Sequence, residues 1–397
     1  MRTGMRWIVA LVVVLHGLIH LLGAAKGLGW AEVAQLKDPI STAKGVAWLA
    51  AAVLLVVVGG LLVLRARWWW VVGGLAIIVS QTVILTSWSD AKAGTVANVI
   101  LVAAVVYGYA SQGPRSYRAE YRRRVDATLT EPLQRGVVGE SDLAHLPEPV
   151  ATFVRRSGAL GKPGVTNFHA CIHGRIRAGA NKSWMSFTGE QVNTYGPEPS
   201  RLFFMDATMF GLPVDVLHAF VGPSATMRVK ACSLVPMVNA SGPVMDRAET
   251  VTLFNDLCVL APAALLDAPI TWQPVDAHHV RALFTNGAHT VAAELVFNDD
   301  FDLVDFVSDD RQRVSLDGKK LTPLRWSTPV RDYRMLDSRR VSIKGEARWD
   351  APDPEGEFAY LEFNLDAITY NTGNPLTRST PRDAGFSASP QQDASLP

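Results

Sequence analysis

The first third of the chain consists mainly of four long stretches that contain no charged residue. They are Trp7–Ala25, Gly45–Leu64, Trp68–Ser89 and Ala93–Gln112. Each is close to the ~20 residues that a helix needs to cross ~30 Å of hydrocarbon. A secretion signal would be shorter and would not be followed by further stretches of this kind. The pattern therefore predicts a transmembrane domain of four helices over residues 1–112.

The polar connections between these stretches differ in their content of lysine and arginine. One side of the membrane would carry nine such residues: Arg2, Arg6, Arg65, Arg67, Arg115, Arg118, Arg122, Arg123 and Arg124. The other side would carry four: Lys26, Lys37, Lys44 and Lys92. Because positive residues favour the cytoplasmic side, we expect a multi-pass protein of the cell membrane whose polar part is cytoplasmic. Gly94, Thr95 and Asn98 make the fourth span the weakest, and without it the polar part would lie outside.

We predict that residues 113–139 form a basic juxtamembrane linker between the membrane domain and the rest of the chain. Tyr117 and Tyr121 lie there among five arginines between positions 115 and 124. Such a stretch could lie on anionic lipid headgroups, where each positive charge contributes about 1 kcal/mol of binding free energy. It could equally serve only to orient the membrane domain, and the sequence leaves both interpretations open.

From residue 165 onward, apolar and polar residues alternate with the period of two that is typical of β-strands. The expected strands are Phe168–His173, Ser183–Thr188, Leu202–Met205, Thr226–Lys230, His279–Phe284, His289–Phe297, Leu303–Ser308, Leu321–Met335, Val341–Trp349 and Phe358–Tyr370. Asn286-Gly287 and Asp317-Gly318 stand between such runs, and these pairs are strong signals for tight hairpin turns. The pattern predicts an antiparallel β domain over residues 140–371.

Helical spacing appears once before this β pattern and once within it. A short helix is expected over Ser141–Ser157, and a longer one over Met245–Leu266. One long helix inside an antiparallel meander predicts an α+β domain, in which a curved sheet or half-barrel carries the helix 245–266 on its concave face. The tail, residues 372–397, is rich in Ser, Pro, Gln and Asp and is expected to be disordered.

Composition and charge exclude several classes of protein. The chain has 397 residues, is 48% hydrophobic and only 19% charged, and has 38 basic against 37 acidic side chains. This balance argues against a nucleic-acid-binding protein. Its cysteines, Cys171, Cys232 and Cys258, are too widely spaced for a disulfide framework or a cysteine zinc site. No GxSxG, P-loop or GxGxxG motif is present, so we predict neither a catalytic residue nor a cofactor.

Two histidines stand out within the first apolar stretch. His16 and His20 are four residues apart and therefore share one face of the helix. They could ligate a metal ion or transfer protons, as polar groups deep in a membrane often do. Alternatively, they could hold the bundle together through hydrogen bonds to Gln81 or Asn98.

The longer predicted helix carries its own polar residues. Glu249, Thr252 and Asp256 form a polar face opposite the apolar one. Two carboxylates ~10 Å apart could serve acid–base chemistry, but a solvated helix face is the preferred interpretation. Asn255 interrupts the apolar side, and if it is buried it needs a partner such as a strand backbone or a ligand head group.

Several segments resemble a known group of proteins. They are His16-Gly-Leu-Ile-His-Leu-Leu-Gly23, the run from Glu249 to Cys258, Pro262-Ala-Ala-Leu-Leu266 and Ile270-Thr-Trp272. This set resembles bacterial multi-pass membrane proteins whose soluble part is a domain of unknown function, a resemblance that implies no activity. More remotely, the expected sheet and helix resemble the half-barrel of LolA-type lipoprotein carriers, which hold acyl chains outside the cytoplasmic membrane. Fold alone does not imply function.

A helix ~10–12 Å across cannot fill a wide curved sheet, so we expect an apolar cavity beside it. Its expected lining is Phe254, Asn255, Leu257, Leu266, Trp272, Phe284 and Phe297. The leading hypothesis is a membrane-tethered binding module for a lipid-like or other hydrophobic ligand, with membrane lipids as partners and no nucleic acid. One alternative is an integral-membrane enzyme or a redox or metal protein that uses the two histidines. The other is a scaffold or sensor without a small ligand. The sequence does not indicate an oligomeric state.

Overall fold

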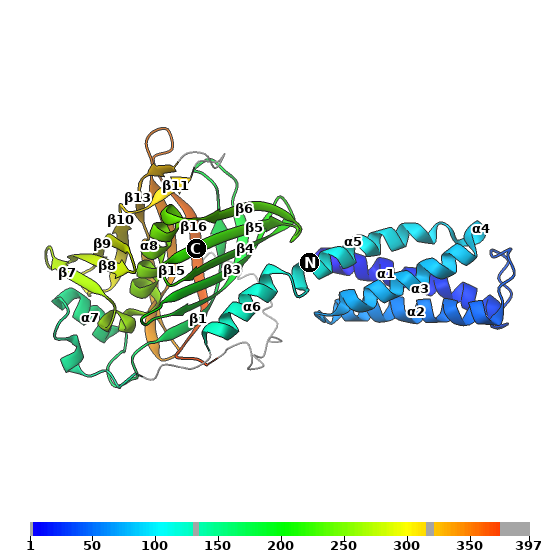
Figure 1. Cartoon of the computed structure of the whole chain (residues 1–397), viewed down its shortest axis with the longest axis horizontal. Helices are drawn as coiled ribbons and strands as arrows, with labels where there is room; N and C mark the ends of the chain where they lie inside the picture. Colours follow the sequence, from blue (N-terminus) through cyan, green and yellow to red (C-terminus); the bar gives the residue numbers. More distant parts are fainter. Residues whose placement is uncertain (1–2, 130–134, 315–320, 374–397) are drawn as a thin grey trace, which may run out of the picture.

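The structure is a computed structural model that describes residues 3–129, 135–314 and 321–373. It consists of a long helical bundle followed by a β-rich domain (Figure 1). The expected disordered tail lies, from residue 374 onward, outside the described residues. The predicted Asp317-Gly318 turn also lies outside them.

The four predicted apolar helices are confirmed. They are α1 (Thr3–Gly27), α2 (Thr42–Val63), α3 (Trp69–Thr86) and α5 (Gly94–Gln112), with the short α4 (Trp88–Ala91) before α5. All four are long and apolar enough to cross a membrane. Small residues let them approach closely, as is usual where helices have no hydrophobic effect to drive their packing. A side chain at Gly17 would meet α2, and one at Gly108 would meet the ring of Trp69.

The expected basic linker contains a further helix, α6 (Tyr117–Thr128). It begins after Ser116, whose side chain accepts a hydrogen bond from the Ala119 amide at 3.1 Å and so caps the helix. Tyr117, Tyr121 and Val125 are buried against one face of the sheet. This part of the chain therefore attaches the sheet to the bundle.

Fourteen strands form one antiparallel sheet. Their bounds are β1 (Asn167–Ile176), β2 (Met185–Thr194), β3 (Ser200–Met209), β4 (Leu212–Val221), β5 (Ser224–Ala231), β6 (Val235–Ser241), β7 (Ile270–Pro274), β8 (His279–Asn286), β9 (His289–Phe297), β10 (Leu303–Ser308), β13 (Arg325–Ser327), β14 (Val330–Leu336), β15 (Arg339–Asp350) and β16 (Glu357–Tyr370). Their order is β6-β5-β4-β3-β2-β1-β16-β15-β13-β10-β9-β8-β7, and β14 pairs with β15. The edges β6 and β7 do not pair, so the sheet is not closed into a barrel.

Two sequence predictions are corrected in this domain, both at prolines. Instead of one strand Leu321–Met335 there are three: β13, β14 and β12 (Leu321–Pro323), which pairs with β11 (Gln312–Val314). Instead of one helix Ser141–Ser157 there are a 3₁₀ turn, η1 (Glu140–Leu143), and helix α7 (Glu148–Arg156). Pro323, Pro329 and Pro147 account for the breaks, because proline offers no N–H and restricts the residue before it.

The predicted covering helix is present as α8 (Pro243–Leu260), and it ends earlier than expected because Pro262 starts a 3₁₀ turn, η2 (Pro262–Leu266). The sheet curls around α8, which contacts β5 and β6 on one side and β9, β10 and β15 on the other (Figure 1). For this reason the second half of α8 is buried on all sides rather than on one face. The confirmed fold is thus a four-helix bundle joined to an open antiparallel sheet that wraps one helix.

Candidate functional site

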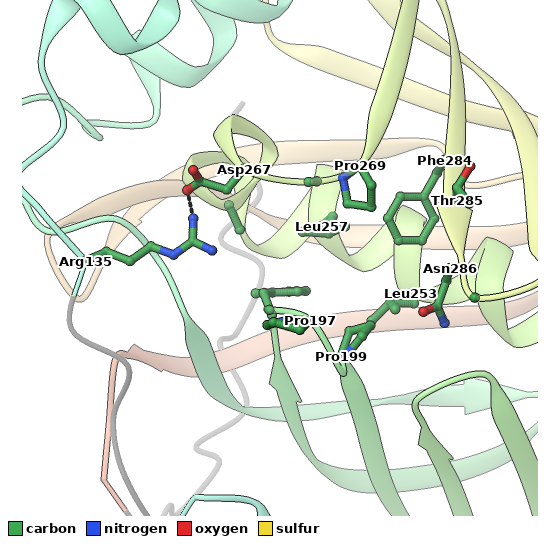
Figure 2. Close-up of a pocket in the computed structure, with 15 residues that line it drawn as sticks. Arg135, Pro197, Pro199, Leu253, Leu257, Asp267, Pro269, Phe284, Thr285 and Asn286 are labelled. Carbon is green, nitrogen blue, oxygen red and sulfur yellow. Dashed lines mark ion pairs between the residues drawn. The ribbon is translucent and has the colours of Figure 1, made fainter.

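A cavity of about 400 Å³ lies beside the second half of α8 (Figure 2). The helix contributes Leu253 and Leu257, and β8 contributes Phe284. The remaining walls come from the chain before β1, the β2–β3 connection, η2 with the η2–β7 connection, and the end of β8 with its turn. Their residues are Arg135, Tyr195, Gly196, Pro197, Pro199, Ala264, Asp267, Ala268, Pro269, Thr285, Asn286 and Gly287. A mostly apolar cavity with a few polar groups in its lining is the usual form of a small-molecule site.

Prolines shape the walls of the cavity. Pro197 and Pro199 lie in the β2–β3 connection, and Pro269 lies between η2 and β7. Proline fixes its own backbone angle and has no N–H, so these positions present rings to the cavity without an unpaired donor. These parts of the walls are therefore both rigid and apolar.

A hydrogen bond joins the two halves of the open sheet next to the cavity. Asn286 lies at the β8–β9 turn, and its side-chain nitrogen donates to the Gly222 carbonyl of the β4–β5 turn at 2.9 Å. A side chain at Gly287 would come within 3.0 Å of the ring of Pro223, so the two turns are in close contact. The turn Asn286-Gly287 that the sequence predicts thus closes part of the gap between the distant strands.

Charged residues mark one side of the cavity. Arg135 forms an ion pair with Asp267 across the space between the chain before β1 and the η2–β7 connection (Figure 2). The Arg135 side chain is half-buried, whereas that of Asp267 is exposed. The cavity thus has an apolar interior and an ionic boundary with solvent.

The predicted lining residues occupy different places. Leu257 and Phe284 line the cavity. Phe254 is buried behind it, stacked on Phe284 with ring centres 5.1 Å apart, and Phe297 packs on Phe153 with ring centres 5.7 Å apart. The other three predicted residues, Asn255, Leu266 and Trp272, do not line the cavity.

Asn255 is buried, and its side-chain oxygen has no hydrogen-bond partner among the described residues. Leu266 and Trp272 are partly buried against the outside of the core. Sequence reasoning missed the β2–β3 connection, although Gly196-Pro197-Glu198-Pro199 is a conspicuous turn signal.

The expected solvated face of α8 is instead buried. Glu249 is 4% exposed and Asp256 is 7% exposed. Both contact Arg201 of β3, whose Nε donates to Asp256 Oδ2 at 2.8 Å and whose Nη1 donates to Glu249 Oε2 at 3.2 Å. The solvated-face interpretation is wrong because the sheet curls over this side of the helix and supplies a charged partner.

Neighbouring strand residues complete this network. Gln191 and Asn193 of β2 donate to the same Asp256 oxygen at 2.7 and 3.0 Å. Asn193 also reaches the hydroxyl of Tyr195, a residue that lines the cavity, at 3.5 Å. The buried charges are therefore paired and hydrogen-bonded, as low-dielectric surroundings require.

The network holds Glu249 and Arg201 in their charged forms. Burial alone would raise the pKa of Glu249, but nearby His218 and Arg201 outweigh it and lower the pKa to about 2. The His218 ring nitrogen lies 3.8 Å from Glu249 Oε1. Burial opposes the charge of Arg201 as well, yet the two carboxylates raise its pKa. Through Arg201, both carboxylates fasten α8 to β3.

The intramembrane histidines belong to a hydrogen-bonded cluster. His16 Nε2 lies 3.2 Å from both Ser80 Oγ and Asn98 Oδ1, and His20 Nε2 lies 3.0 Å from Ser80 Oγ. Asn98 in turn donates to Gln81 at 2.9 Å. Within the described residues, no third His, Cys, Asp or Glu joins His16 and His20 in a group that could hold a metal ion. The contacts match the expected cross-helix bonds, with Ser80 as a member that was not anticipated.

Comparison with known proteins gives remote structural neighbours and one family. A domain named as an outer membrane lipoprotein-sorting protein from Vibrio parahaemolyticus matches with a TM-score of 0.31 and 10% identity, over 52% of this chain and 86% of its own. A DUF1329 family protein from Desulfovibrio piger matches with 0.33 and 11%, over 57% and 92%. LprF from Mycobacterium bovis matches with 0.20 and 12%, over 62% and 99%. At these TM-scores the likeness supports no functional conclusion.

No curated protein matches the sequence. A family model does, and it covers residues 136–363, which is nearly the whole β domain together with η1 and α7. This match confirms the resemblance to a family whose soluble part has no known function. The chain belongs to DUF6544, a family of unknown function.

Proposed function

We propose that the β domain binds a small hydrophobic or lipid-like molecule beside α8, and that the helical bundle holds this binding domain at a membrane. The observation that carries the proposal is the cavity of about 400 Å³ between Leu253, Leu257, Phe284 and the proline-rich connections. Ligand cavities typically measure ~300–1,000 Å³ and are mainly apolar. The volume of this cavity falls within that range, and its lining is mainly apolar.

The polar groups of the cavity suggest how such a ligand would be oriented. Arg135, Asp267 and Asn286 all lie on its boundary, whereas its helix-facing wall is aliphatic. An amphipathic molecule would place its apolar part against Leu253 and Leu257 and its polar end near the ion pair. The cavity lies toward the small end of the typical range, so a single chain or ring system fits better than a whole diacyl lipid.

Native mass spectrometry of the full chain, purified in detergent, tests the proposal directly. We expect a co-purifying small molecule, and saturable binding of a fluorescent fatty acid such as cis-parinaric acid. Ala264→Phe fills the cavity from η2 and should reduce binding at least tenfold while the protein stays folded. Leu257→Arg should abolish binding and also destabilise the domain, because it places a charge in an apolar wall.

Val275→Arg is the matched control, because Val275 is exposed on the β7–β8 connection and does not line the cavity. Its binding should equal that of the unchanged protein. The proposal is rejected if no molecule co-purifies and the fatty acid binds equally to the unchanged chain and to Ala264→Phe. A scaffold or sensor role would then be the better hypothesis.

A further inference from the structure

Two neighbouring hairpins of the β domain end in exposed apolar side chains. The β3–β4 turn carries Phe210, which is 88% exposed, and the β5–β6 turn leads into the edge strand β6. We call the following residues the apolar tip: Phe210, Leu212, Leu234, Val235 and Met237. The last four are 47–56% exposed. So many large apolar side chains on adjacent turns are unusual on a surface that meets only water.

The apolar tip lies at the end of the β domain that faces the helical bundle. Figure 1 shows the hairpins of β3–β6 reaching toward the bundle beside α6. Arg118, in the first turn of α6, donates to Asp206 of β3 at 3.1 Å. From Asp206 the strand continues toward Phe210 for a further ~13 Å at ~3.3 Å per residue.

The joint between α5 and α6 is short and hydrogen-bonded. Helix α5 ends at Gln112 and α6 begins at Tyr117. Between them, the Gly113 amide donates to the Tyr109 carbonyl at 2.8 Å, and the Ser116 hydroxyl donates to the Gly113 carbonyl at 2.8 Å. Because α6 is also packed on the sheet through Tyr117 and Tyr121, the orientation of the hairpins relative to α5 is set by these contacts.

The backbone at Phe210 shows that its side chain is not there to help the hairpin fold. Met209 pairs with Leu212, so Phe210 and Gly211 form a two-residue turn, and their φ angles are +49° and +87°. Positive φ at both positions is the mark of a type I′ turn, where Asn, Asp and Gly are preferred. A bulky residue with positive φ is strained. An exposed aromatic ring at such a position calls for a partner outside the β domain.

We propose that the apolar tip inserts into the bilayer that holds the helices, in the leaflet from which α5 emerges. Its side chains would lie at the boundary between headgroups and acyl chains, where aromatic residues are favoured. Arg115 directly precedes the cap of α6, and the Arg123 side chain reaches back to donate to the Pro114 carbonyl at 2.7 Å. Both guanidinium groups would therefore meet anionic headgroups at the start of the helix. The β domain is thereby held against the membrane by two attachments, α6 and the apolar tip. This docking does not depend on the proposed ligand.

Photo-crosslinking in liposomes of phosphatidylethanolamine and phosphatidylglycerol tests this docking with the full chain. A p-benzoylphenylalanine side chain is introduced at Phe210, at Val235 or, as a control, at Val275. Val275 is 63% exposed and follows β7, the edge of the sheet opposite β6. We expect lipid adducts at positions 210 and 235, at least tenfold above those at position 275. Equal yields at all three positions, or adducts between two copies of the chain at position 210, would overturn the proposal.

A substitution that suits the turn provides an independent test. Phe210→Asn should leave the hairpin intact or stabilise it, because Asn is favoured in a type I′ turn. In the same liposomes it should at least halve the lipid adducts at position 235 and speed hydrogen exchange of residues 232–238. Met335→Asn, at an exposed position near the β14–β15 turn, is the matched control and should change neither. Unchanged adducts in Phe210→Asn would contradict insertion of the tip.

Discussion

The Nε of Arg201 lies 2.8 Å from Oδ2 of Asp256, although 55 residues separate them in the sequence. The same guanidinium reaches Glu249, so one arginine of β3 holds two carboxylates on α8. Leu253 and Leu257, which form the helical wall of the cavity, lie on the same stretch of helix. The buried ion network therefore sets the position of the wall against which we expect a ligand to pack.

Replacing Arg201 by Met should strongly destabilise the β domain. The change leaves two buried carboxylates without their counter-charge, which typically costs about 3–5 kcal/mol. The free energy of unfolding, measured by urea denaturation of the detergent-solubilised chain, is the readout. Adding Glu249→Gln and Asp256→Asn to Arg201→Met should recover much of the loss, because no charge is then buried. A loss below about 1 kcal/mol in the single variant would show that the network is not enclosed as described.

Removing the bridge between the two turns should loosen the cavity. Asn286→Ala deletes the hydrogen bond to the Gly222 carbonyl and leaves that buried acceptor unpaired, at about 1–3 kcal/mol. We expect faster hydrogen exchange of residues 221–224 and 285–289 and weaker fatty-acid binding. Asn239→Ala, at an exposed position on β6, should have no such effect. Unchanged exchange at both turns in Asn286→Ala would contradict a bridging role.

Asp305 gives the β domain a specific dependence on pH. Burial raises its pKa to about 6, although the amide of Phe306 partly offsets this. In the unfolded chain the pKa is about 3.9, so between about pH 6 and pH 4 the folded state binds more protons. Stability from this group therefore rises as the pH falls through that window, and ionised Asp305 destabilises the fold above it.

Asp305→Asn should accordingly raise the melting temperature at pH 7.5 and have little effect at pH 4. The exposed Asp300→Asn is the control and should follow the unchanged protein throughout. Glu249, whose lowered pKa has the opposite effect at still lower pH, is present in all of these proteins. Differences between variants thus isolate Asp305. A stability gain from Asp305→Asn that is equal at pH 4 and pH 7.5 would contradict the assignment.

Most of the fold was predictable because the main elements show a clear local periodicity of apolar residues. Uninterrupted apolar stretches gave the four membrane helices, and alternation around Asn286-Gly287 gave the antiparallel sheet. The helix α8 was also recognisable, but its polar residues were not interpretable from spacing alone. A polar face directed at water and one directed at a charged strand residue have the same pattern, and Arg201 is remote in sequence from both Glu249 and Asp256.

The candidate site was predictable only in part, for a related reason. Leu257 and Phe284 were identified because they lie on the helix and on a strand that were both expected. Pro197 and Pro269 were missed because they belong to connections, whose positions depend on how the sheet curls. No local pattern in the sequence predicts that the β2–β3 connection lies beside the η2–β7 connection.

The histidine cluster leads to a prediction about the bundle. The sequence favours His16 as the more important of the two, because it lies deeper in its helix. In the structure His20 is just as enclosed, and its ring contacts both the His16 carbonyl and Ser80 at 3.0 Å. We therefore expect His16→Leu and His20→Leu to destabilise the bundle by similar amounts, about 1 kcal/mol each. Ser80→Ala should remove the hydrogen bonds that the Ser80 hydroxyl makes with His16 and with His20. The measurement is thermal unfolding in detergent. If none of the three changes alters the melting temperature, the hydrogen bonds of the cluster do not stabilise the bundle.

The side of the membrane on which the β domain lies follows from the parity of the spans. Helix α5 has 19 residues, which corresponds to about 28 Å at 1.5 Å per residue, enough to cross the hydrocarbon core. With four crossings both ends of the bundle are on one side, and the nine lysines and arginines on that side against four on the other predict that it is cytoplasmic. A green fluorescent protein fused after Gln112 should therefore fluoresce, and alkaline phosphatase at the same position should be inactive.

Fusions after Leu36, in the connection between α1 and α2, are the matched control and should give the reverse result. Phosphatase activity after Gln112 without fluorescence would place the β domain outside the cytoplasm. The physical reason for such an outcome would lie in α5, where Asn98 lowers the gain from inserting this helix into lipid. Asn98 bonds to Gln81 of α3 within the bundle, so its cost is reduced only once the helices have packed. Asn98→Leu should then restore the fluorescent orientation, because it removes that cost without changing the charge distribution on which the positive-inside rule depends.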